Sequence, residues 1–318
     1  MIPTIINDGE VLLTSLIIAL IWDLIYPKHS GLLLKIHPVH TCYFMALRLH
    51  KPCSSKTYGL LIWLACMSTH LMPWVLLYVI TSLFNNAASL IARIVATSFI
   101  IKVSFSIRLL LEECYSVYSC LVRGNIECGR RYAQGLVRRD LSNLGKEHVC
   151  SATIESLAES FVDGFLAPLF YFILFGPLGA LAQRLINTLD GALGFKSEEF
   201  KEEGFFSARV DDVINFIPAR LSVLLFLLSS LILRYDVKGL LRSWSKYSSA
   251  TESPNAGHPM SAMAGCLNIW LEKPGFYKIN VEGRKPCEYD ILNALKITTC
   301  STIITLSTVI LILAIYAV

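Results

Sequence analysis

The sequence predicts an all-α protein that crosses a membrane several times, and three observations support this. Of its 318 residues, 54% are hydrophobic and only 16% are charged, whereas soluble domains carry about 25% charged residues. The mean hydropathy is +0.56. Apolar runs near the roughly 20 residues that a bilayer-spanning helix needs recur along the chain. We therefore expect a polytopic α-helical integral membrane protein of the cell membrane, with residues 1–318 forming a single membrane domain.

Six apolar runs are the candidate spans. The first contains Asp23, the third contains Arg93 and Lys102, and the fourth has no charge. The first run has no basic segment before it and no small-residue cleavage site after it, so we interpret it as a retained span. The six runs are Val11–Tyr26, Tyr58–Phe84, Ala87–Leu111, Phe165–Ala182, Ile217–Leu233 and Ile297–Val318.

Glycine and proline interrupt the fourth run and its approach, at Gly164, Pro168, Gly176, Pro177 and Gly179. Both residue types break helices, and broken helices at membrane depth usually line a cavity that is buried in protein. The pattern therefore predicts a re-entrant or broken helix at this point of the chain.

The distribution of Lys and Arg predicts the orientation. The basic loops 27–57 and 108–150 are expected in the cytoplasm, with the N-terminus outside. Residues of about 108–160 are predicted to form amphipathic helices at the inner membrane surface, and the polar segment 236–293 is also assigned to that side. Simple alternation then sends residues 184–215 outside. A re-entrant hairpin and a site within the bilayer are two open ways to resolve that conflict.

Several common site types are absent from the sequence. The 10 cysteines form no Cys-x-x-Cys pair, which argues against a zinc site, and we expect structural cysteines with reduced thiols. A net charge of +4, with no basic run that has aromatic residues interleaved, argues against nucleic acid as a partner. Two glycine-rich phosphate-binding motifs, Gly-x-x-x-x-Gly-Lys-Ser/Thr and Gly-x-Gly-x-x-Gly, are both absent. A nucleotide would therefore bind without either of these loops.

Three acidic residues, Glu155, Glu159 and Asp163, stand four residues apart just before the fourth run. On a helix this spacing places them on one face. Like charges at this spacing repel, so a cation should compensate them, and Mg²⁺ commonly bridges carboxylates to phosphates. The alternative is a solvated acidic face. Because the stripe leads directly into a membrane segment, we favour the functional interpretation.

A second polar group stands at the mouth of the fifth run: Arg209, Asp211, Asp212, Asn215 and Arg220. Neighbouring aspartates cannot both face one way on a helix, so one is a candidate metal ligand and the other a candidate anchor for an arginine. Arginine suits bidentate contacts to phosphate or carboxylate. The alternative is an internal Arg–Asp pair at the helix mouth.

Two turn-like motifs offer further polar groups. Asn187 and Asp190 are suited to ligating a metal or holding a hydroxyl, or they simply end a helix before a glycine turn. Ser253, Asn255 and Gly257 precede a run of small residues. A helix N-terminus there would bind an anion, and an ordinary capped helix is the alternative.

Two weaker candidates complete the set. Asp23 lies within the first run, where an ionisable residue is a functional candidate or forms a buried pair, for instance with His37. Arg139, in the sequence Arg-Arg-Asp, lies in the predicted inner-surface segment. It is a candidate contact for substrate, and the alternative is a solvated surface charge.

Together these motifs resemble one family closely, the membrane adenosylcobinamide-phosphate synthase family of cobalamin biosynthesis. They occur in the family's order from about residue 20 to residue 287, and only the set as a whole is specific. Ser160, Cys266 and Lys28 depart from the family's pattern. The resembling segments are His37–Val39, Val137–Asp140, Glu155–Glu159, Asp163–Gly164, Ala167–Tyr171, Asn187–Asp190, Ala208–Arg220, Ser253–Gly257 and Met263–Gly265.

The resemblance implies an ATP-dependent ligase. An amide bond would join (R)-1-aminopropan-2-yl phosphate, or free aminopropanol, to a propionate of adenosylcobyric acid and give adenosylcobinamide phosphate. Because a carboxylate is a poor acylating agent, its phosphorylation by ATP would make an acyl phosphate that the amine attacks, with Mg²⁺ and cationic groups stabilising the charge. The expected partners are the corrinoid, the amino-alcohol phosphate and membrane lipid. Whether the chain forms a homo-oligomer stays open.

On this hypothesis the candidate residues fall into three groups. The candidates to orient the amine or take its proton are Asp212 and Asp190. The candidate ligands of Mg²⁺ are Glu155, Glu159, Asp163 and Asp211. The candidate substrate contacts, with phosphate assigned to Arg209, Arg220 and the Ser253–Gly257 turn, are His37, Arg139, Asn187, Arg209, Asn215, Arg220, Ser253, Asn255 and Gly257.

Two other classes of function remain as alternatives. A transporter of a corrinoid or another polar solute would also have broken helices and charges within the membrane, although no repeated halves are visible. A Mg²⁺-dependent transferase of lipid headgroups would also use carboxylates on membrane helices, but here they are spread over three segments. The mass of the product distinguishes the three classes.

Overall fold

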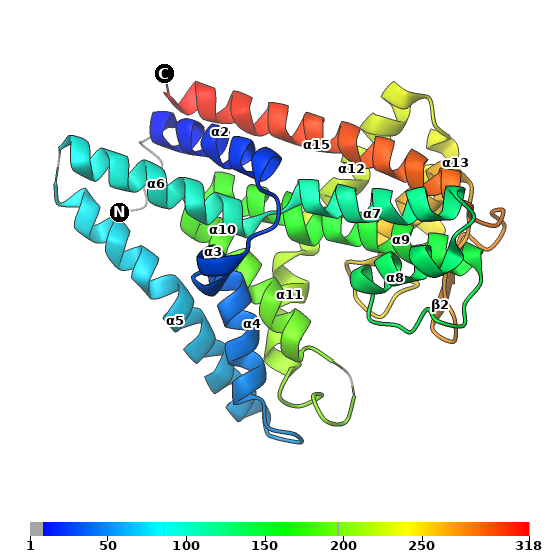
Figure 1. Cartoon of the computed structure of the whole chain (residues 1–318), viewed down its shortest axis with the longest axis horizontal. Coiled ribbons are helices and arrows are strands. Elements are labelled where there is room, and N and C mark those ends of the chain that lie inside the picture. Colours follow the sequence, from blue (N-terminus) through cyan, green and yellow to red (C-terminus); the bar gives the residue numbers. More distant parts are fainter. Residues whose placement is uncertain (1–8, 85, 196, 318) are drawn as a thin grey trace. The chain divides into compact units, whose positions relative to one another are not determined.

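The computed structural model describes residues 9–84, 86–195 and 197–317. Its internal contacts divide the chain into two compact units, each assembled from separate parts of the sequence. The first unit comprises Met1–Ser106, Asp163–Ile214 and Thr308–Val318, and the second comprises Ile107–Val162 and Asn215–Ser307. Both consist mainly of helices, as Figure 1 shows, which confirms the predicted all-α fold class.

Helix α10 is the central element of the first unit, where α4, α5, α6 and α11 pack against it, and α2 packs along α6. Apolar side chains from four of these helices, including Cys66, Ile100 and Leu185, form the core. The elements are α2 (Gly9–Ile25), α3 (Gly31–Lys35), α4 (Pro38–Leu49), α5 (Lys56–Ser82), α6 (Ala87–Ser104), η1 (Val162–Leu166, its first residue in the second unit), α10 (Ala167–Leu193) and α11 (Phe205–Ile214).

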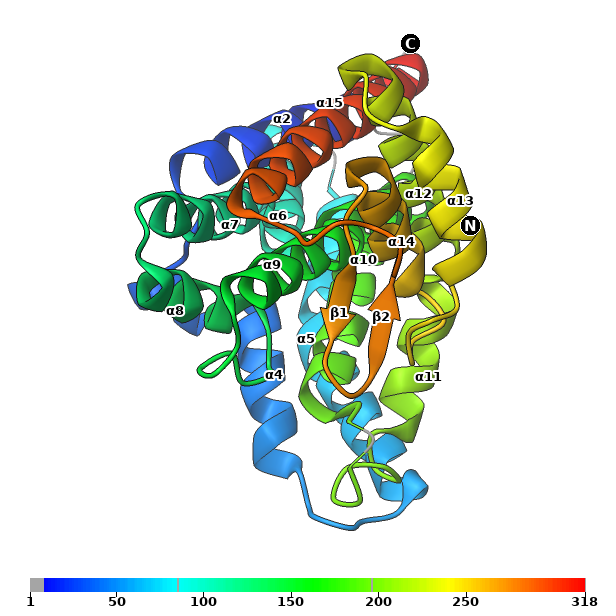
Figure 2. The same ribbon diagram turned by 90° about the vertical axis from the view of Figure 1, so that its right-hand side faces the viewer.

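Helix α9 is the corresponding centre of the second unit, with α7, α8, α14 and strand β1 packed against it. Figure 2 shows the two short strands side by side next to α9 and α14. The elements are α7 (Ile107–Val122), α8 (Ile126–Leu136), α9 (Lys146–Phe161), α12 (Phe216–Leu233), α13 (Val237–Tyr247), α14 (Gly257–Leu267), β1 (Leu271–Lys273), β2 (Tyr277–Ile279) and α15 (Glu288–Ala317, which ends in the first unit).

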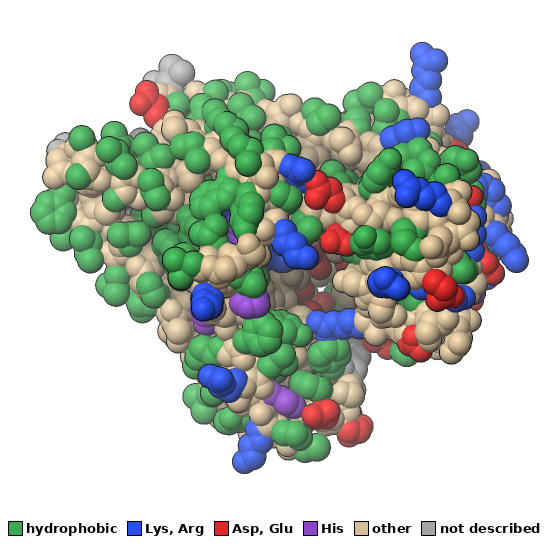
Figure 3. Space-filling view, in the orientation of Figure 1, with side chains coloured by type: hydrophobic (Ala, Val, Ile, Leu, Met, Phe, Trp, Pro, Cys, Tyr) green, Lys and Arg blue, Asp and Glu red, His purple; other side chains and the backbone are tan. Residues whose placement is uncertain are grey.

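Five stretches of the described residues are long and apolar enough to span a membrane, which supports the prediction of a membrane protein. In Figure 3 hydrophobic side chains cover much of the surface over α2, α5 and α6, as lipid contact requires. The described part of α2 has 17 residues, or about 26 Å of helix, and is not among the five. The five are Lys56–Ser82, Ala87–Val122, Lys146–Leu193, Phe216–Leu233 and Glu288–Ala317; Val318, the last residue of the predicted sixth run, lies outside the described residues.

The predicted break in the fourth run is confirmed. Within α10, Gly176 has φ 67° and ψ −163°, a non-helical conformation, and Pro177 follows it. Glycine adopts positive φ without steric cost, and proline cannot donate the backbone hydrogen bond that would continue the helix. A second irregularity precedes α10, because η1 is one turn of π-helix, a feature that is frequent at functional sites.

Three features differ from the sequence-based expectations. Every residue of α9 from Val149 to Ala158 is buried, so this part of the predicted inner-surface segment is a core helix, enclosed by its neighbours. The β1–β2 hairpin was not predicted; its signal is the Pro-Gly turn, with Gly275 at φ 80°. Finally, Cys120 and Cys128 form a disulfide between α7 and α8, whereas the other eight cysteines are free thiols, as expected.

Candidate functional site

An arginine that the sequence analysis did not single out, Arg184, lies at the centre of a polar cluster in the first unit. It is half-buried on α10 and follows the break at Gly176 in the sequence. Its Nη1 donates hydrogen bonds to Asn187 Oδ1 at 3.0 Å and to the backbone carbonyl of Asp163 at 3.4 Å. The carboxylates of Asp163 and Asp211 are close enough to act electrostatically on the guanidinium.

Three elements position this cluster. Asp163 stands on η1, Asn187 on α10 one turn beyond Arg184, and Asp211 on α11, which packs against α10. Asn187 links two of them, because its Nδ2 donates to Asp211 Oδ1 at 3.3 Å. Three of the predicted site residues from distant sequence motifs therefore meet around one cation that was not predicted. We call Asp163, Arg184, Asn187 and Asp211 the Arg184 cluster.

His37 lies near this cluster at the start of α4, which packs against α10. Its Nδ1 accepts a hydrogen bond from the His40 amide at 3.4 Å and so caps the helix. Burial, together with the positive charges of nearby side chains including Arg184, lowers the pKa of His37 to about 3. The imidazole is therefore neutral at pH 7. Its predicted partner Asp23 instead binds Lys102, with Oδ1 2.7 Å from Nζ.

The other predicted residues of the first unit lie at the ends of the same helices. Asp190 is in the last turn of α10, where its carboxylate lies over Gly194; a Cβ on that glycine would stand 1.9 Å from Asp190 Oδ1. Arg209 is exposed on α11, with its guanidinium carbon 5.6 Å from the centre of the Phe205 ring. Asp212 is half-buried on α11 beside Asp211.

The second unit has a different polar cluster, centred on Glu155 of α9, which is only 3% exposed. Arg139 binds it in a bidentate pair, with both N–O distances at 2.9 Å. Ser151 Oγ donates to Oε1 at 2.5 Å, and the Tyr277 hydroxyl of β2 donates to Oε2 at 2.7 Å. We call these four residues the Glu155 cluster. Each carboxylate oxygen accepts two hydrogen bonds, which leaves no lone pair for a metal ion.

This pairing also sets the charge states of the cluster. Burial disfavours the charged Arg139, but the hydrogen bonds and charge of Glu155 outweigh it and raise the pKa of the guanidinium. Burial and the same carboxylate raise the pKa of the Tyr277 hydroxyl, which keeps its proton as a donor. The prediction that Glu155 is a metal ligand is not supported by this geometry. Glu159, one turn further along α9, is half-buried.

The second unit contains another polar group, in which Arg220 contacts the predicted anion-binding turn. Arg220 Nη1 donates to Asn255 Oδ1 at 3.3 Å and to the Phe216 carbonyl at 2.7 Å. Ser253 Oγ accepts from the amides of Asn255 and Ala256 before α14 begins. Two of these predicted contacts, Arg220 and Asn255, are thus brought together, and the serine orders the turn.

The surroundings of this turn are tightly packed. A Cβ on Gly257 would lie 2.1 Å from the Ser248 carbonyl, so this position needs glycine. The next residue, His258, accepts a hydrogen bond at Nδ1 from Trp244 Nε1 at 2.8 Å. Burial and the charge of Arg220 lower the pKa of His258 to about 4. Asn215 is buried, and its backbone carbonyl accepts from the Ala219 amide at the start of α12.

Neither cluster forms a metal site by itself. Among residues 9–84, 86–195 and 197–317, no three His, Cys, Asp or Glu side chains come together in a way that could hold a metal ion. Mg²⁺ nevertheless commonly binds one or two carboxylates and completes its shell with substrate phosphates and water. Asp163 and Asp211 are of the right chemical type for such a site, whereas the saturated Glu155 is not.

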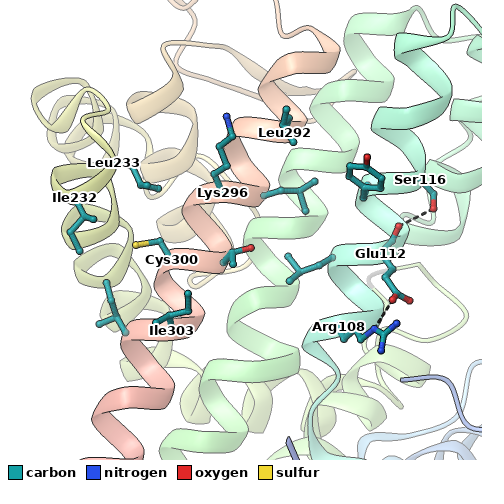
Figure 4. A pocket seen from close by; sticks show the side chains of 14 residues that line it. Arg108, Glu112, Ser116, Ile232, Leu233, Leu292, Lys296, Cys300 and Ile303 are labelled. Carbon is teal, nitrogen blue, oxygen red and sulfur yellow. Dashed lines mark hydrogen bonds and ion pairs between the residues drawn. The ribbon is translucent and has the colours of Figure 1, made fainter. Parts of the chain in front are cut away.

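The second unit also contains a groove of about 1060 Å³ between α7, α12 and α15. Figure 4 shows its lining, which is mainly apolar and includes Leu292 and Ile303, with Lys296 toward one end and an Arg108–Glu112 pair at one side. None of its lining residues was predicted as a site residue. Its apolar walls lie on candidate membrane helices and offer few groups for chemistry on charged substrates.

Sequence reasoning missed Arg184 and Tyr277. Arg184 had a usable signal, because it follows the uncharged fourth run by only two positions, and a cation at the edge of a span needs a partner. Tyr277 had no comparable signal. It reaches Glu155 only because the hairpin returns to α9, a pairing of residues 122 positions apart.

Comparison with known proteins identifies the family. Residues 16–307 match the family described as CobD/Cbib protein. The chain is 46% identical over 273 residues to a protein of Aeropyrum pernix named probable cobalamin biosynthesis protein CobD, covering 86% of this chain and 84% of that one. Proteins of the same name from Thermoplasma acidophilum and Thermoplasma volcanium are 43% and 38% identical; the matches cover 66% and 75% of this chain and 68% and 76% of theirs. No solved structure matches. The chain therefore belongs to the CobD/CbiB protein family.

Proposed function

We propose that this protein acts in cobalamin biosynthesis as an adenosylcobinamide-phosphate synthase. It would join (R)-1-aminopropan-2-yl phosphate, or aminopropanol, to adenosylcobyric acid at the expense of ATP. Family membership and the names of the relatives support the role in cobalamin biosynthesis. The Arg184 cluster is the observation that supports ligase chemistry, because it gathers two carboxylates, an amide and a guanidinium from distant segments beside apolar helices.

The proposed reaction has two balanced steps. The corrinoid carboxylate attacks the γ-phosphorus of ATP, which releases ADP and forms an acyl phosphate. The amine then attacks the acyl carbon, a proton leaves the nitrogen, inorganic phosphate departs and the amide remains. A general base within reach of that proton accelerates the second step. Asp212 and Asp190 are the proposed candidates for this role, and both lie on helices that carry the Arg184 cluster.

Magnesium and ATP are the proposed cofactors. The ion would neutralise charge on the transferred phosphoryl group. Asp163 and Asp211 are its proposed ligands in the first unit, and Glu159, in the second unit, remains a sequence-based prediction. Arg209, in the first unit, and the Arg220–Asn255 pair with the Ser253–Gly257 turn, in the second, are the proposed phosphate contacts. Arg139 is better assigned to positioning, because Glu155 engages both of its terminal nitrogens.

The test is direct synthesis by the purified protein in lipid nanodiscs. We expect ATP, Mg²⁺, adenosylcobyric acid and the amine to give a product whose mass equals the amide adduct, and complementation of a strain blocked between cobyric acid and cobinamide. Asp211→Asn should lower kcat by at least about tenfold, because it removes a charge from the site. Wild-type turnover in Asp163→Asn, Asp211→Asn and Asp212→Asn would contradict the site assignment.

A transporter remains the second candidate, because the break in α10 at Gly176 is of the kind that lines transport pathways. Labelled corrinoid that enters proteoliposomes unchanged, with no amide adduct formed, would favour it. A modified lipid in the same assay would indicate a headgroup transferase.

A further inference from the structure

Arg184 uses little of its capacity to donate hydrogen bonds. A guanidinium has five N–H donors in a planar fork. Both hydrogen bonds of Arg184 come from Nη1, and among the described residues Nε and Nη2 donate none. They are also not among the buried nitrogens that lack a partner. The edge formed by Nε and Nη2 is therefore unpaired among these residues and not fully sealed, and its geometry is suited to a bidentate contact with an oxyanion.

The neighbours of this edge hold it in place. Asn187 accepts from Nη1 and is itself fixed by its bond to Asp211, while the Asp163 carbonyl receives the second bond of Nη1. A guanidinium that is anchored on one side loses less entropy when an anion binds to the other. The uncharged imidazole of His37 adds no further charge on the side of α4.

Charge narrows the choice of ligand. The Arg184 cluster contains two carboxylates and one cation, so a purely anionic ligand meets net negative charge. In the metal-free cluster, ATP brings anionic groups only and meets the two carboxylates without a cation to offset them. An amino-alcohol phosphate brings its own ammonium group together with its phosphate, and both ends find a group of opposite charge.

On this basis, and resting on the proposed function, we propose that Arg184 is the residue that recognises the phosphate of the amino-alcohol phosphate. Its Nε–Nη2 edge donates to two phosphate oxygens, and the acidic members of the cluster lie near the ammonium end. Arg184 thereby determines the preference for the phosphorylated amine over free aminopropanol.

The experiment compares two amines in one assay. The variant Arg184→Gln should raise KM for the amino-alcohol phosphate by about 10- to 100-fold, the loss expected for hydrogen bonds to a charged group. KM for unphosphorylated aminopropanol should change by less than about threefold, since it lacks the phosphate that Arg184 contacts. Arg184→Lys retains the charge without the fork and should fall between. Arg48→Gln, which removes an exposed cation on α4, is the matched control and should change neither amine.

Equilibrium binding separates this inference from the proposed function. Labelled amino-alcohol phosphate should bind to the wild-type protein in nanodiscs with ATP and Mg²⁺ absent, and binding should weaken in Arg184→Gln. Such binding supports the recognition site even if no amide forms. Equal losses for both amines, or a rise in KM for ATP alone, would overturn the assignment. Thermal unfolding of each variant identifies a misfolded one, and Arg184→Lys then provides the decisive comparison.

Discussion

Each unit of the molecule contains an arginine beside acidic residues, and the two arginines differ in how their donors are used. In the second unit, Arg139 gives both terminal nitrogens to the buried Glu155. In the first unit, Arg184 keeps one edge of its guanidinium without a described partner. The same residue types thus form a saturated internal ion pair, Arg139–Glu155, in the second unit and leave unpaired donors on Arg184 in the first. Which of the two arises depends on the number of fixed acceptors that surround the guanidinium.

The largest effect on the free energy of unfolding is expected at the Arg139–Glu155 ion pair. Arg139→Met should destabilise the protein by about 3–5 kcal/mol, because it leaves the buried Glu155 without its counter-charge. Unfolding by a denaturing detergent in mixed micelles measures this. The double variant Arg139→Met with Glu155→Leu is the control and should regain much of the loss, since both charges are then gone. A single-variant loss below about 1 kcal/mol would contradict the structural role of the pair.

A smaller loss of stability is expected when the β1–β2 hairpin no longer donates a hydrogen bond to Glu155. Tyr277→Phe removes one hydrogen bond to the Glu155 carboxylate and should cost about 1.5–3 kcal/mol in the same unfolding assay. KM for the amine should not change, because the hydroxyl is engaged inside the second unit. Phe276→Leu, at the neighbouring exposed position, serves as the control. Equal stability of the Tyr277→Phe and wild-type proteins would show that the hairpin does not depend on this contact.

The stability of the region around the Arg184 cluster should depend on pH through His37. The pKa of His37 in the folded protein is about 3, below its unfolded value of about 6.5. The unfolded state therefore takes up the proton first, so stability should fall as the pH drops from about 6.5 toward 3, by at most about 1.4 kcal/mol per pH unit. His37→Asn replaces the capping nitrogen with an amide oxygen and should flatten the slope, with a remainder from His29 and His258, whose pKa values burial also lowers. An unchanged slope in this variant would assign the effect to other groups.

The smallest change in stability is expected for substitution of Arg184 itself. Arg184→Gln should alter the free energy of unfolding by less than about 1 kcal/mol, because the arginine makes two hydrogen bonds and one of them, at 3.4 Å, is weak. The same substitution is expected to have a large effect on KM. If its loss of stability matched that of Arg139→Met, the two arginines would have the same role and the comparison would fail.

Much of the fold follows from local sequence rules. Composition and run length located the five candidate membrane spans, although the first predicted run is not among them, and the Gly-Pro pair at Gly176 predicted the break in α10. The candidate residues Asn187 and Asp211 do meet, as do Arg220 and Asn255. These predictions succeeded because periodicity and backbone restriction act over a few residues.

The remainder depends on contacts between distant segments. Glu155 has the spacing of a metal ligand in the sequence, yet Arg139 and Tyr277 use its lone pairs. A burial pattern of small and apolar residues makes α9 a core helix, although its charged termini resemble those of a surface helix. No periodicity within α9 encodes a hydrogen bond to a strand more than a hundred residues away.

The sequence by itself determined the membrane class, the broken helix and the family, because hydropathy, glycine and proline conformations and ordered motifs are properties of short stretches. Only the tertiary structure decided which arginine is engaged and which keeps an edge that no described residue pairs with. Hydrogen-bond capacity is consumed by whatever neighbours folding supplies, and those neighbours come from other parts of the chain.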